Sequence, residues 1–247
     1  MAPENTLAAF QQSILDGADG IEFDVRLARD DVPVVIHDPT LNRTATKEAR
    51  RELATTRVCE LTSSELSQVN VPSTFRNRHY ERPTTVPTLQ SVFELFAQAL
   101  GVLYLEMKGE PVNGRLVKKV VNLIQAYSFQ ERVIVECFDH QALLLLKRLA
   151  PEIRTAPLFE RGFRSVLRFR SAEQILLRAE QAFADEVALH YKLANQTTIG
   201  LLMDRGFQVV IWTVDDPRWV ADAERLRIKG VVTNNPAVLL QHRSSTV

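Results

Sequence analysis

The sequence predicts an α/β fold of the TIM (β/α)₈ barrel type. Apolar runs of strand length alternate with amphipathic stretches of helical period, the pattern of repeated βαβ units around a parallel sheet. The length of 247 residues suits one large barrel. No Gly/Ser-rich linker or shift of composition marks a second domain, so we expect one domain over residues 1–247, with a small insertion at about 45–85.

Each element of this pattern can be assigned by its residue range. The expected strands are 20–27, 32–37, 102–108, 133–138, 155–159, 186–191, 207–214 and 230–234. The expected helices are 4–16, 88–100, 113–127, 139–149, 171–183, 196–205 and 217–227. For the first helix the sequence offers Asn5 as the N-cap and Gly17 as the stop.

One connection interrupts the alternation. The segment between the first two strands is too short for a parallel crossover, so these strands must form a hairpin. With Asp30 and Asp31 as a two-residue turn, His37 lies across from Asp24; with the turn shifted by one residue, it lies across from Glu22. When the second strand of this hairpin is set aside, seven parallel strands remain, whereas a closed (β/α)₈ barrel needs eight. We therefore expect the barrel to lack its first strand, with a gap or distorted seam between residues 20–25 and 230–234.

The composition excludes several classes of partner. Thirty basic residues balance thirty acidic ones, which argues against a nucleic acid or an anionic membrane surface as the main partner. No apolar run approaches the length of a membrane span, and no signal peptide is recognisable, so a cytoplasmic location is expected. The two cysteines, Cys59 and Cys137, lack metal-ligand spacing and are expected to be unpaired thiols. The oligomeric state stays open.

Acidic residues in two of the apolar runs point to the chemistry. Glu22 and Asp24, two residues apart on a strand, face the same way, and Glu106 and Lys108 share a face of a later strand. Three carboxylates at one barrel mouth repel one another unless a cation is present, and oxygen ligands suit Mg²⁺ or Ca²⁺. Lys108 suits a phosphate and His37 a proton transfer. The alternative is a buried network of ion pairs without a metal.

At these residues the chain resembles the glycerophosphodiester phosphodiesterase family. The segments that carry the resemblance are PENT, IEFDV and VIHDPTLNRT, followed in family order and spacing by VPTLQSVFELF, LYLEMK, VIVECFD, VVIWTVDDP and GVVTNNP. No single segment is specific, but their combination is. The resemblance covers nearly the whole chain except the region of about 45–80.

The resemblance implies a TIM barrel and a phosphoric diester hydrolase. Members of the family hydrolyse glycerophosphodiesters to glycerol 3-phosphate and an alcohol, using one divalent cation, Mg²⁺ or Ca²⁺. By this resemblance His37 matches one of two catalytic histidines, Lys108 a cation on the phosphate side, and Trp212 the aromatic residue that lines the glycerol pocket. The residues that match the metal ligands are Glu22, Asp24 and Glu106.

The chain also departs from the family pattern. The family begins with a strand that ends in His-Arg-Gly, about ten residues before PENT, whereas here Met1 comes directly before APENT. Hydrolysis is therefore expected to be impaired, and a nearly inactive barrel that binds a cation and a phosphoester without turnover is the alternative. A metal-dependent barrel lyase that acts on an enolisable acid would also fit the three carboxylates, but it would leave the family-wide match unexplained. His190 is the first histidine to consider as a substitute for the missing histidine of the His-Arg-Gly motif. His79, His140 and His242 are expected to be exposed.

Overall fold

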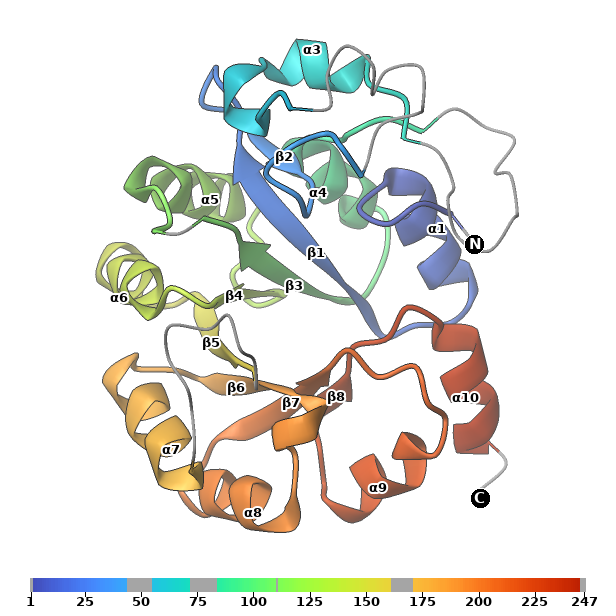
Figure 1. Cartoon of the computed structure of the whole chain (residues 1–247), viewed down its shortest axis with the longest axis vertical. Helices are drawn as coiled ribbons and strands as arrows, with labels where there is room; N and C mark the ends of the chain where they lie inside the picture. Colours follow the sequence, from blue (N-terminus) through green and yellow to red (C-terminus); the bar gives the residue numbers. More distant parts are fainter. Residues whose placement is uncertain (1, 44–54, 72–83, 110, 161–170, 245–247) are drawn as a thin grey trace. The chain divides into compact units, whose positions relative to one another are not determined.

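The computed structural model describes residues 2–43, 55–71, 84–109, 111–160 and 171–244. The chain forms two compact units, Met1–Val133 and Ile134–Val247, which are coloured blue to green and yellow to red in Figure 1. Much of the predicted insertion at about 45–85 lies outside the described residues. The prediction of a single domain stays a prediction.

The first unit is a parallel strand pair with an antiparallel addition. Strand β1 (Gly20–Leu27) pairs in parallel with β3 (Val102–Met107) and antiparallel with β2 (Pro33–Val35). The other elements of the unit are α1 (Leu7–Leu15), η1 (Val58–Glu60), α3 (Ser63–Ser67), α4 (Leu89–Ala97) and α5 (Gly114–Ala126). The predicted strands at 20–27 and 102–108 are confirmed to within one residue.

The alternation of side chains along β1 decides where its acids point. Ile21, Phe23 and Val25 are buried, and Phe23 packs against Phe10 of α1 with ring centroids 5.7 Å apart. Because successive side chains of a strand point to opposite faces, Glu22 and Asp24 leave the face that α1 covers. The apolar face thus anchors the strand, and the opposite face is left for chemistry.

The start of α1 differs from the prediction. The N-cap is Thr6, whose hydroxyl accepts a hydrogen bond from the Ala9 backbone N–H at 3.2 Å and donates one to the Pro3 carbonyl at 2.7 Å. Asn5 is therefore not the N-cap; its backbone has φ 57° and its side chain bonds to Asp24 instead. Of two adjacent residues suited to capping, only the one that directly precedes the first helical residue can cap it.

The hairpin forms, but in neither of the two expected registers. Val25 pairs with Val35 and Leu27 with Pro33, so the loop holds five residues, 28–32, rather than a two-residue turn. The Ala28 N–H donates to the Val32 carbonyl at 3.0 Å, and Asp31 takes the left-handed conformation at φ 59°. Continuing this register aligns His37 with Phe23, between the two acids named in the prediction. His37 itself follows the strand.

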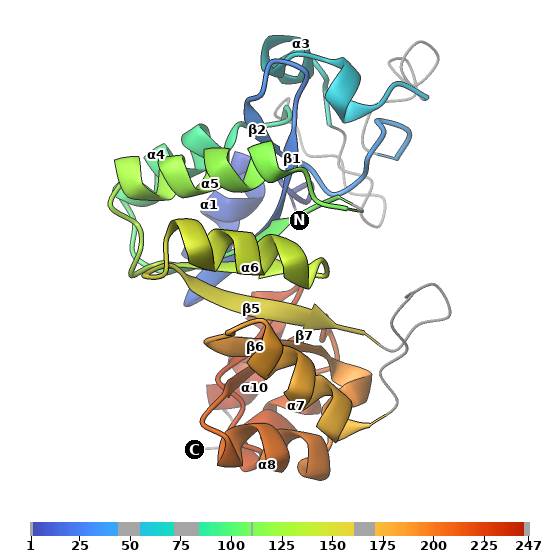
Figure 2. The same ribbon diagram turned by 90° about the vertical axis from the view of Figure 1, so that its left-hand side faces the viewer.

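The second unit repeats strand and helix with parallel pairing from β4 to β8. Its strands are β4 (Val133–Cys137), whose first residue closes the first unit, β5 (Arg154–Phe159), β6 (Glu186–His190), β7 (Gln208–Trp212) and β8 (Gly230–Val231). Its helices are α6 (His140–Leu149), α7 (Ala172–Gln181), η2 (Tyr191–Leu193), α8 (Gln196–Asp204), α9 (Trp219–Arg225) and α10 (Pro236–Ser244). Helices α7 and α8 lie side by side, as Figure 2 shows. Helix α10 was not predicted.

Several helices are followed by a single residue in the left-handed conformation. Glycine serves after α1 and α8, at Gly17 (φ 86°) and Gly206 (φ 85°). After α5, α7 and α9 the same conformation is taken by Ser128, Phe183 and Arg227, at φ 56°, 50° and 55°. A left-handed residue reverses the chain tightly at the end of a helix, so that the next strand can begin within a few residues.

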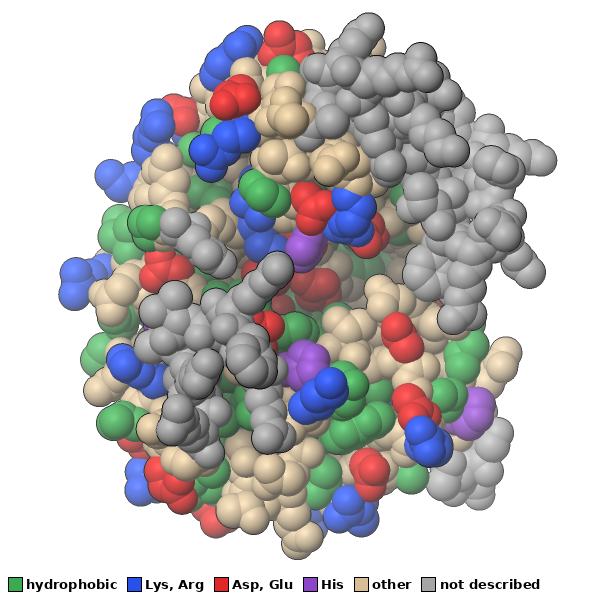
Figure 3. All heavy atoms as spheres, in the orientation of Figure 1, with side chains coloured by type: hydrophobic (Ala, Val, Ile, Leu, Met, Phe, Trp, Pro, Cys, Tyr) green, Lys and Arg blue, Asp and Glu red, His purple; other side chains and the backbone are tan. Residues whose placement is uncertain are grey.

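The remaining general predictions are in part confirmed. Cys59 is exposed and Cys137 is buried, and no disulfide joins them, as expected. Acidic and basic side chains are interspersed over the face shown in Figure 3, in keeping with the balanced charge. None of the helices within the described residues is long and apolar enough to cross a membrane. The cytoplasmic location and the seam, which would join residues of different units, stay predictions.

Candidate metal centre

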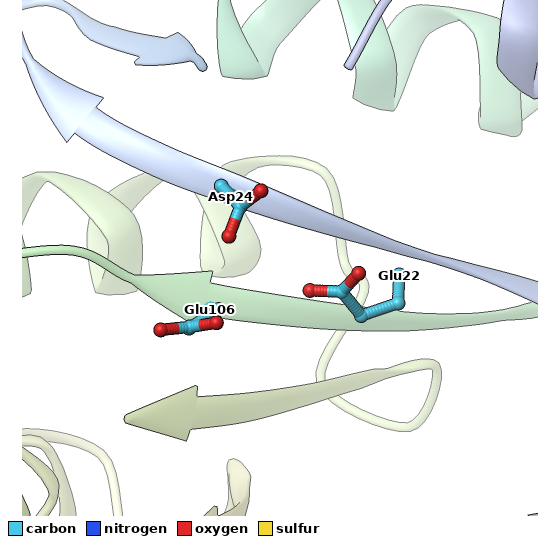
Figure 4. A group of neighbouring side chains, drawn as sticks. All are labelled: Glu22, Asp24 and Glu106. Carbon is cyan, nitrogen blue, oxygen red and sulfur yellow. The ribbon is translucent and has the colours of Figure 1, made fainter. Parts of the chain in front are cut away.

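Three carboxylates from two neighbouring strands gather in the first unit. Glu22 and Asp24 come from β1 and Glu106 from β3, where Asp24 and Glu106 are direct partners in the parallel register. Each of the three offers one carboxylate oxygen, and these oxygens lie within 4.8 Å of one another. Figure 4 shows the three groups beside the two strands. The parallel register sets Glu106 beside Asp24, and Glu22 lies two residues earlier on the same face of β1, so residues distant in the chain converge.

Lys108 lies directly against two of the acids. Its Nζ is 3.0 Å from Asp24 Oδ1 and 2.7 Å from Glu106 Oε1, and its backbone N–H donates to the Val25 carbonyl at 2.9 Å, just beyond the end of β3. The side chain of Lys108 is only 14% exposed, so these ion pairs are shielded from water. Ion pairs of the kind considered from the sequence are therefore present, between Lys108 and two of the three carboxylates.

Burial and the neighbouring charges shift the protonation of this cluster. Burial raises the pKa of Glu106 to about 7, an effect that Lys108 partly offsets and Asp24 increases. Burial alone would lower the pKa of Lys108, but the neighbouring Glu106 and Asp24 outweigh it and raise the pKa. A buried carboxylate that resists ionisation gains most from an added positive charge. With oxygen as the only ligand atom, this donor set fits a hard divalent cation such as Mg²⁺ or Ca²⁺.

Asn5, which the sequence suggested as the N-cap of α1, belongs to this site. Its Nδ2 donates to Asp24 Oδ2 at 2.8 Å, and its Oδ1 accepts from the Asp24 backbone N–H at 3.0 Å. The signal that could have revealed it is the pair Asn5-Thr6, in which one residue caps the helix and the other is left for a different contact.

His37 belongs to a second polar cluster, formed by residues that follow β2. Its Nδ1–H donates to Asp38 Oδ1 at 2.7 Å, and its backbone carbonyl accepts from Arg26 Nε at 2.8 Å. The His37 side chain is 50% exposed, in contrast to the buried position that the neighbouring apolar run suggests. With Nδ1 committed to a carboxylate, the imidazole has Nε2 as the atom that can take or give a proton.

Arg43 holds the carboxylate that orients this imidazole. Its Nε donates to Asp38 Oδ2 at 2.6 Å, and its Nη2 donates to Glu4 Oε1 at 2.5 Å. Burial would raise the pKa of Asp38, but the hydrogen bonds from Arg43 and His37 outweigh it and hold the pKa below its usual value. The sequence reasoning did not assign Asp38 or Arg43, although both lie in the segment HDPTLNRT beside His37.

The hydrogen bonds of Asp38 with Arg43 and His37 predict how the stability of the fold depends on pH. Because the pKa of Asp38 is lowered in the folded chain, its contribution is present above the unfolded value of about 3.8 and is lost as the pH falls further. We expect Asp38→Asn to lower the free energy of unfolding by about 1 kcal/mol at pH 7, a modest amount because Arg43 is half exposed. Urea unfolding at pH 7 and pH 3 checks this. An equal loss at both pH values would show that the charge of Asp38 does not contribute to stability.

Trp212 lies in the second unit within a group of aromatic rings. It ends β7 beside His190, the last residue of β6, with ring centroids 5.2 Å apart and the planes nearly perpendicular. Phe138, which follows β4, meets the indole edge-on at 5.7 Å. The Nδ1 of His190 accepts from the Lys192 backbone N–H at 3.3 Å, and burial, with Lys192 nearby, lowers the pKa of the imidazole. The predicted role of Trp212 in a glycerol pocket stays a prediction.

The other histidines divide between confirmed and corrected expectations. His242 is exposed in the last turn of α10, as expected. His140 is not exposed: it begins α6 with its ring 5.1 Å from that of Phe159, and burial lowers its pKa. The first residue of a helix that packs on a strand can turn its side chain inward, which the polar neighbours of His140 in the sequence concealed. His79 lies outside the described residues.

Comparisons with known proteins agree with this picture. The model of the glycerophosphoryl diester phosphodiesterase family matches residues 1–238. A glycerophosphodiester phosphodiesterase of Caldanaerobacter subterraneus subsp. tengcongensis is 30% identical over 243 residues, which cover 96% of this chain and 91% of that protein.

Two solved structures show the same fold. One is a phosphodiesterase from Oleispira antarctica in complex with the product sn-glycerol-3-phosphate, with a TM-score of 0.81 and 22% identity over 98% of this chain and 92% of that one. The other is a glycerophosphodiester phosphodiesterase from Agrobacterium tumefaciens str. C58, with a TM-score of 0.76 and 23% identity over 98% of this chain and 94% of that one.

These matches confirm the predicted fold class, a TIM-barrel-type α/β fold. They also confirm the enzyme class, because proteins of this family are phosphoric diester hydrolases. The family model extends over nearly the whole chain, and the relative with 30% identity spans it almost from end to end. The chain therefore belongs to the glycerophosphoryl diester phosphodiesterase family.

Proposed function

We propose that the chain hydrolyses glycerophosphodiesters to glycerol 3-phosphate and an alcohol with the help of one divalent cation, Mg²⁺ or Ca²⁺. Glu22, Asp24 and Glu106 would hold the cation. The observation that carries this proposal is the set of three carboxylates with ligand oxygens within 4.8 Å of one another, in a chain of this family. When bound, a divalent cation supplies positive charge next to the phosphodiester and polarises its oxygens.

Lys108 is suited to bind the phosphate. A lysine ammonium has three N–H donors, and Asp24 and Glu106 accept from two of them. The third can point to a phosphate oxygen. The two carboxylates hold the ammonium in place and keep it charged, since they raise its pKa against the effect of burial. Once a divalent cation is bound, the site can also accept the negative charge of the phosphodiester.

His37 is suited to move the proton. Hydrolysis breaks the P–O bond to the alcohol and forms a P–O bond to the attacking oxygen, so the nucleophile loses a proton and the departing alkoxide gains one. Nε2 of His37 can perform one of these transfers, because Asp38 holds Nδ1 and so fixes the orientation of the ring. We also propose that Trp212 offers its ring to the carbon face of the glycerol.

A paired measurement tests this function. Calorimetric titration of the metal-free chain with Mg²⁺ and with Ca²⁺ should show one bound cation, and release of glycerol 3-phosphate from a glycerophosphodiester should depend on that cation. Binding without product release would favour the alternative, a barrel that holds cation and phosphoester without turnover. Absence of binding for both cations would rule out the three-carboxylate site. Product release that persists in excess chelator would rule out the role of the cation.

A further inference from the structure

The backbone of Asn5 is in a conformation that asparagine adopts at a cost. Its φ of 57° lies in the left-handed region, which glycine occupies most readily. Non-glycine residues held in such regions gather at functional sites, where the surrounding structure maintains them. A glycine at position 5 would meet the backbone requirement with less strain. The presence of a side chain at this position therefore calls for a reason in what that side chain contacts.

The carboxamide of Asn5 contacts Asp24 twice. Its oxygen accepts from the Asp24 backbone N–H at 3.0 Å, and its nitrogen donates to Asp24 Oδ2 at 2.8 Å. This pairing has only one sensible orientation, since turning the amide over would set its oxygen against a carboxylate oxygen. The Asp24 backbone carbonyl, in turn, accepts from the Ile36 N–H at 2.9 Å. Asn5 thus lies beside β1 at the point where the backbone hydrogen bonds between β1 and β2 end.

The two oxygens of Asp24 are held from two sides. Oδ2 accepts from Asn5, while Oδ1 lies 3.0 Å from Lys108 Nζ. The carboxylate is 8% exposed, so water competes little for these contacts. With one donor on each oxygen, the plane of the carboxylate is fixed, and its remaining lone pairs keep a constant direction. The neighbouring Thr6, 1% exposed and bonded to both Pro3 and Ala9, makes the support of Asn5 rigid.

We propose that Asn5 is a positioning residue for the cation site: it orients the Asp24 carboxylate so that Asp24, Glu22 and Glu106 can bind one ion together. This role rests on the proposed function, because it requires that the three carboxylates hold a cation. Partners that orient ligand side chains in this way typically change metal affinity by about 10–100-fold when they are removed.

Titration of Asn5→Gly with Mg²⁺ tests the proposal. Glycine accepts the backbone conformation, so the variant removes the two contacts without adding strain. We expect the Kd for Mg²⁺ to rise by about 10–100-fold, measured by calorimetry on metal-free protein. The matched control is Asp31→Gly, which removes a half-buried side chain from another left-handed position in the same unit, at φ 59°. Its Kd should stay within about twofold of that of the unaltered chain.

The outcomes separate this proposal from the function on which it rests. If the unaltered chain binds Mg²⁺ and Asn5→Gly binds it equally well, the positioning role is overturned and the cation site stands. If the unaltered chain binds no cation, both are overturned. A second measurement serves if Asn5→Gly does not fold: in the unaltered chain, the NMR signals of the Asn5 side-chain NH₂ should shift as Mg²⁺ is added, with the calorimetric Kd. Signals that do not move overturn the role.

Discussion

Replacing His37 with alanine is expected to slow glycerophosphodiester hydrolysis by about 10²–10⁴-fold, the usual contribution of one general acid or base. The imidazole is fixed through its Nδ1–H bond to Asp38, so Nε2 is the atom that exchanges a proton with the reacting oxygen. Because half of the side chain is exposed, its removal leaves no buried cavity, and the melting temperature should hardly change. Initial rates of glycerol 3-phosphate release, with the cation in excess, provide the measurement.

The matched control is His242→Ala, which removes an exposed imidazole from the last turn of α10. Its rate should equal that of the unaltered chain. Full activity in His37→Ala would show that the imidazole has only a structural role. His190, which ends β6 beside Trp212, would then be the next histidine to replace.

Replacing Glu106 with glutamine is expected to have two opposite effects. Hydrolysis should fall by at least about 100-fold, since removing a ligand costs no less than removing the partner that orients one. The metal-free chain, however, should become more stable by about 1 kcal/mol, which corresponds to about 2–4 °C in melting temperature for a chain of this size. Glu106 shares the Lys108 ammonium with Asp24, and burial already raises the pKa of Glu106 to about 7, so a neutral side chain suits the buried position better.

A buried glutamate with the reverse charge balance provides the control. Glu186 is 1% exposed and is paired with both Lys229 and Arg154, so it is outnumbered by positive charges. Glu186→Gln should therefore lower the melting temperature, because it removes a buried negative charge that pairs with both cations. Thermal unfolding in chelator compares the two variants. A lower melting temperature in Glu106→Gln as well would mean that Lys108 needs both of its partners and that the cluster carries no excess charge.

The sequence was sufficient to locate the strands but not the details of their ends. Alternation of apolar runs and helical stretches placed β1, β3 and β6 within a residue or two, since burial of one face imposes that pattern directly. The hairpin register was missed because it depends on the loop, and five residues closed by a left-handed Asp31 cannot be told from a two-residue turn by spacing. Helix α10 was missed because its segment shows no clear periodicity.

The candidate site divides in the same way. That the carboxylates of Glu22, Asp24 and Glu106 converge follows from strand parity and parallel pairing, both of which can be read from spacing. The roles of Asn5 and Arg43 could not be read in this way. Each contacts residues that are distant in the sequence: Asn5 contacts Asp24, 19 positions away, and Arg43 contacts Glu4, 39 positions away. Such contacts are consequences of the assembled fold, not of local pattern.

The left-handed residues at the helix ends separate two kinds of tolerance to mutation. Ser128, Phe183 and Arg227 each hold a conformation that a glycine would hold with about 1 kcal/mol less strain, and each precedes a strand. Of the candidate ligands, Asp24 and Glu106 lie in the second half of their own strands, whereas Glu22 is the third residue of β1. A substitution to glycine at one of these three positions can therefore change the stability of the fold without altering any of the three carboxylates. Stability and chemistry can thus be adjusted by substitutions at different positions of the chain.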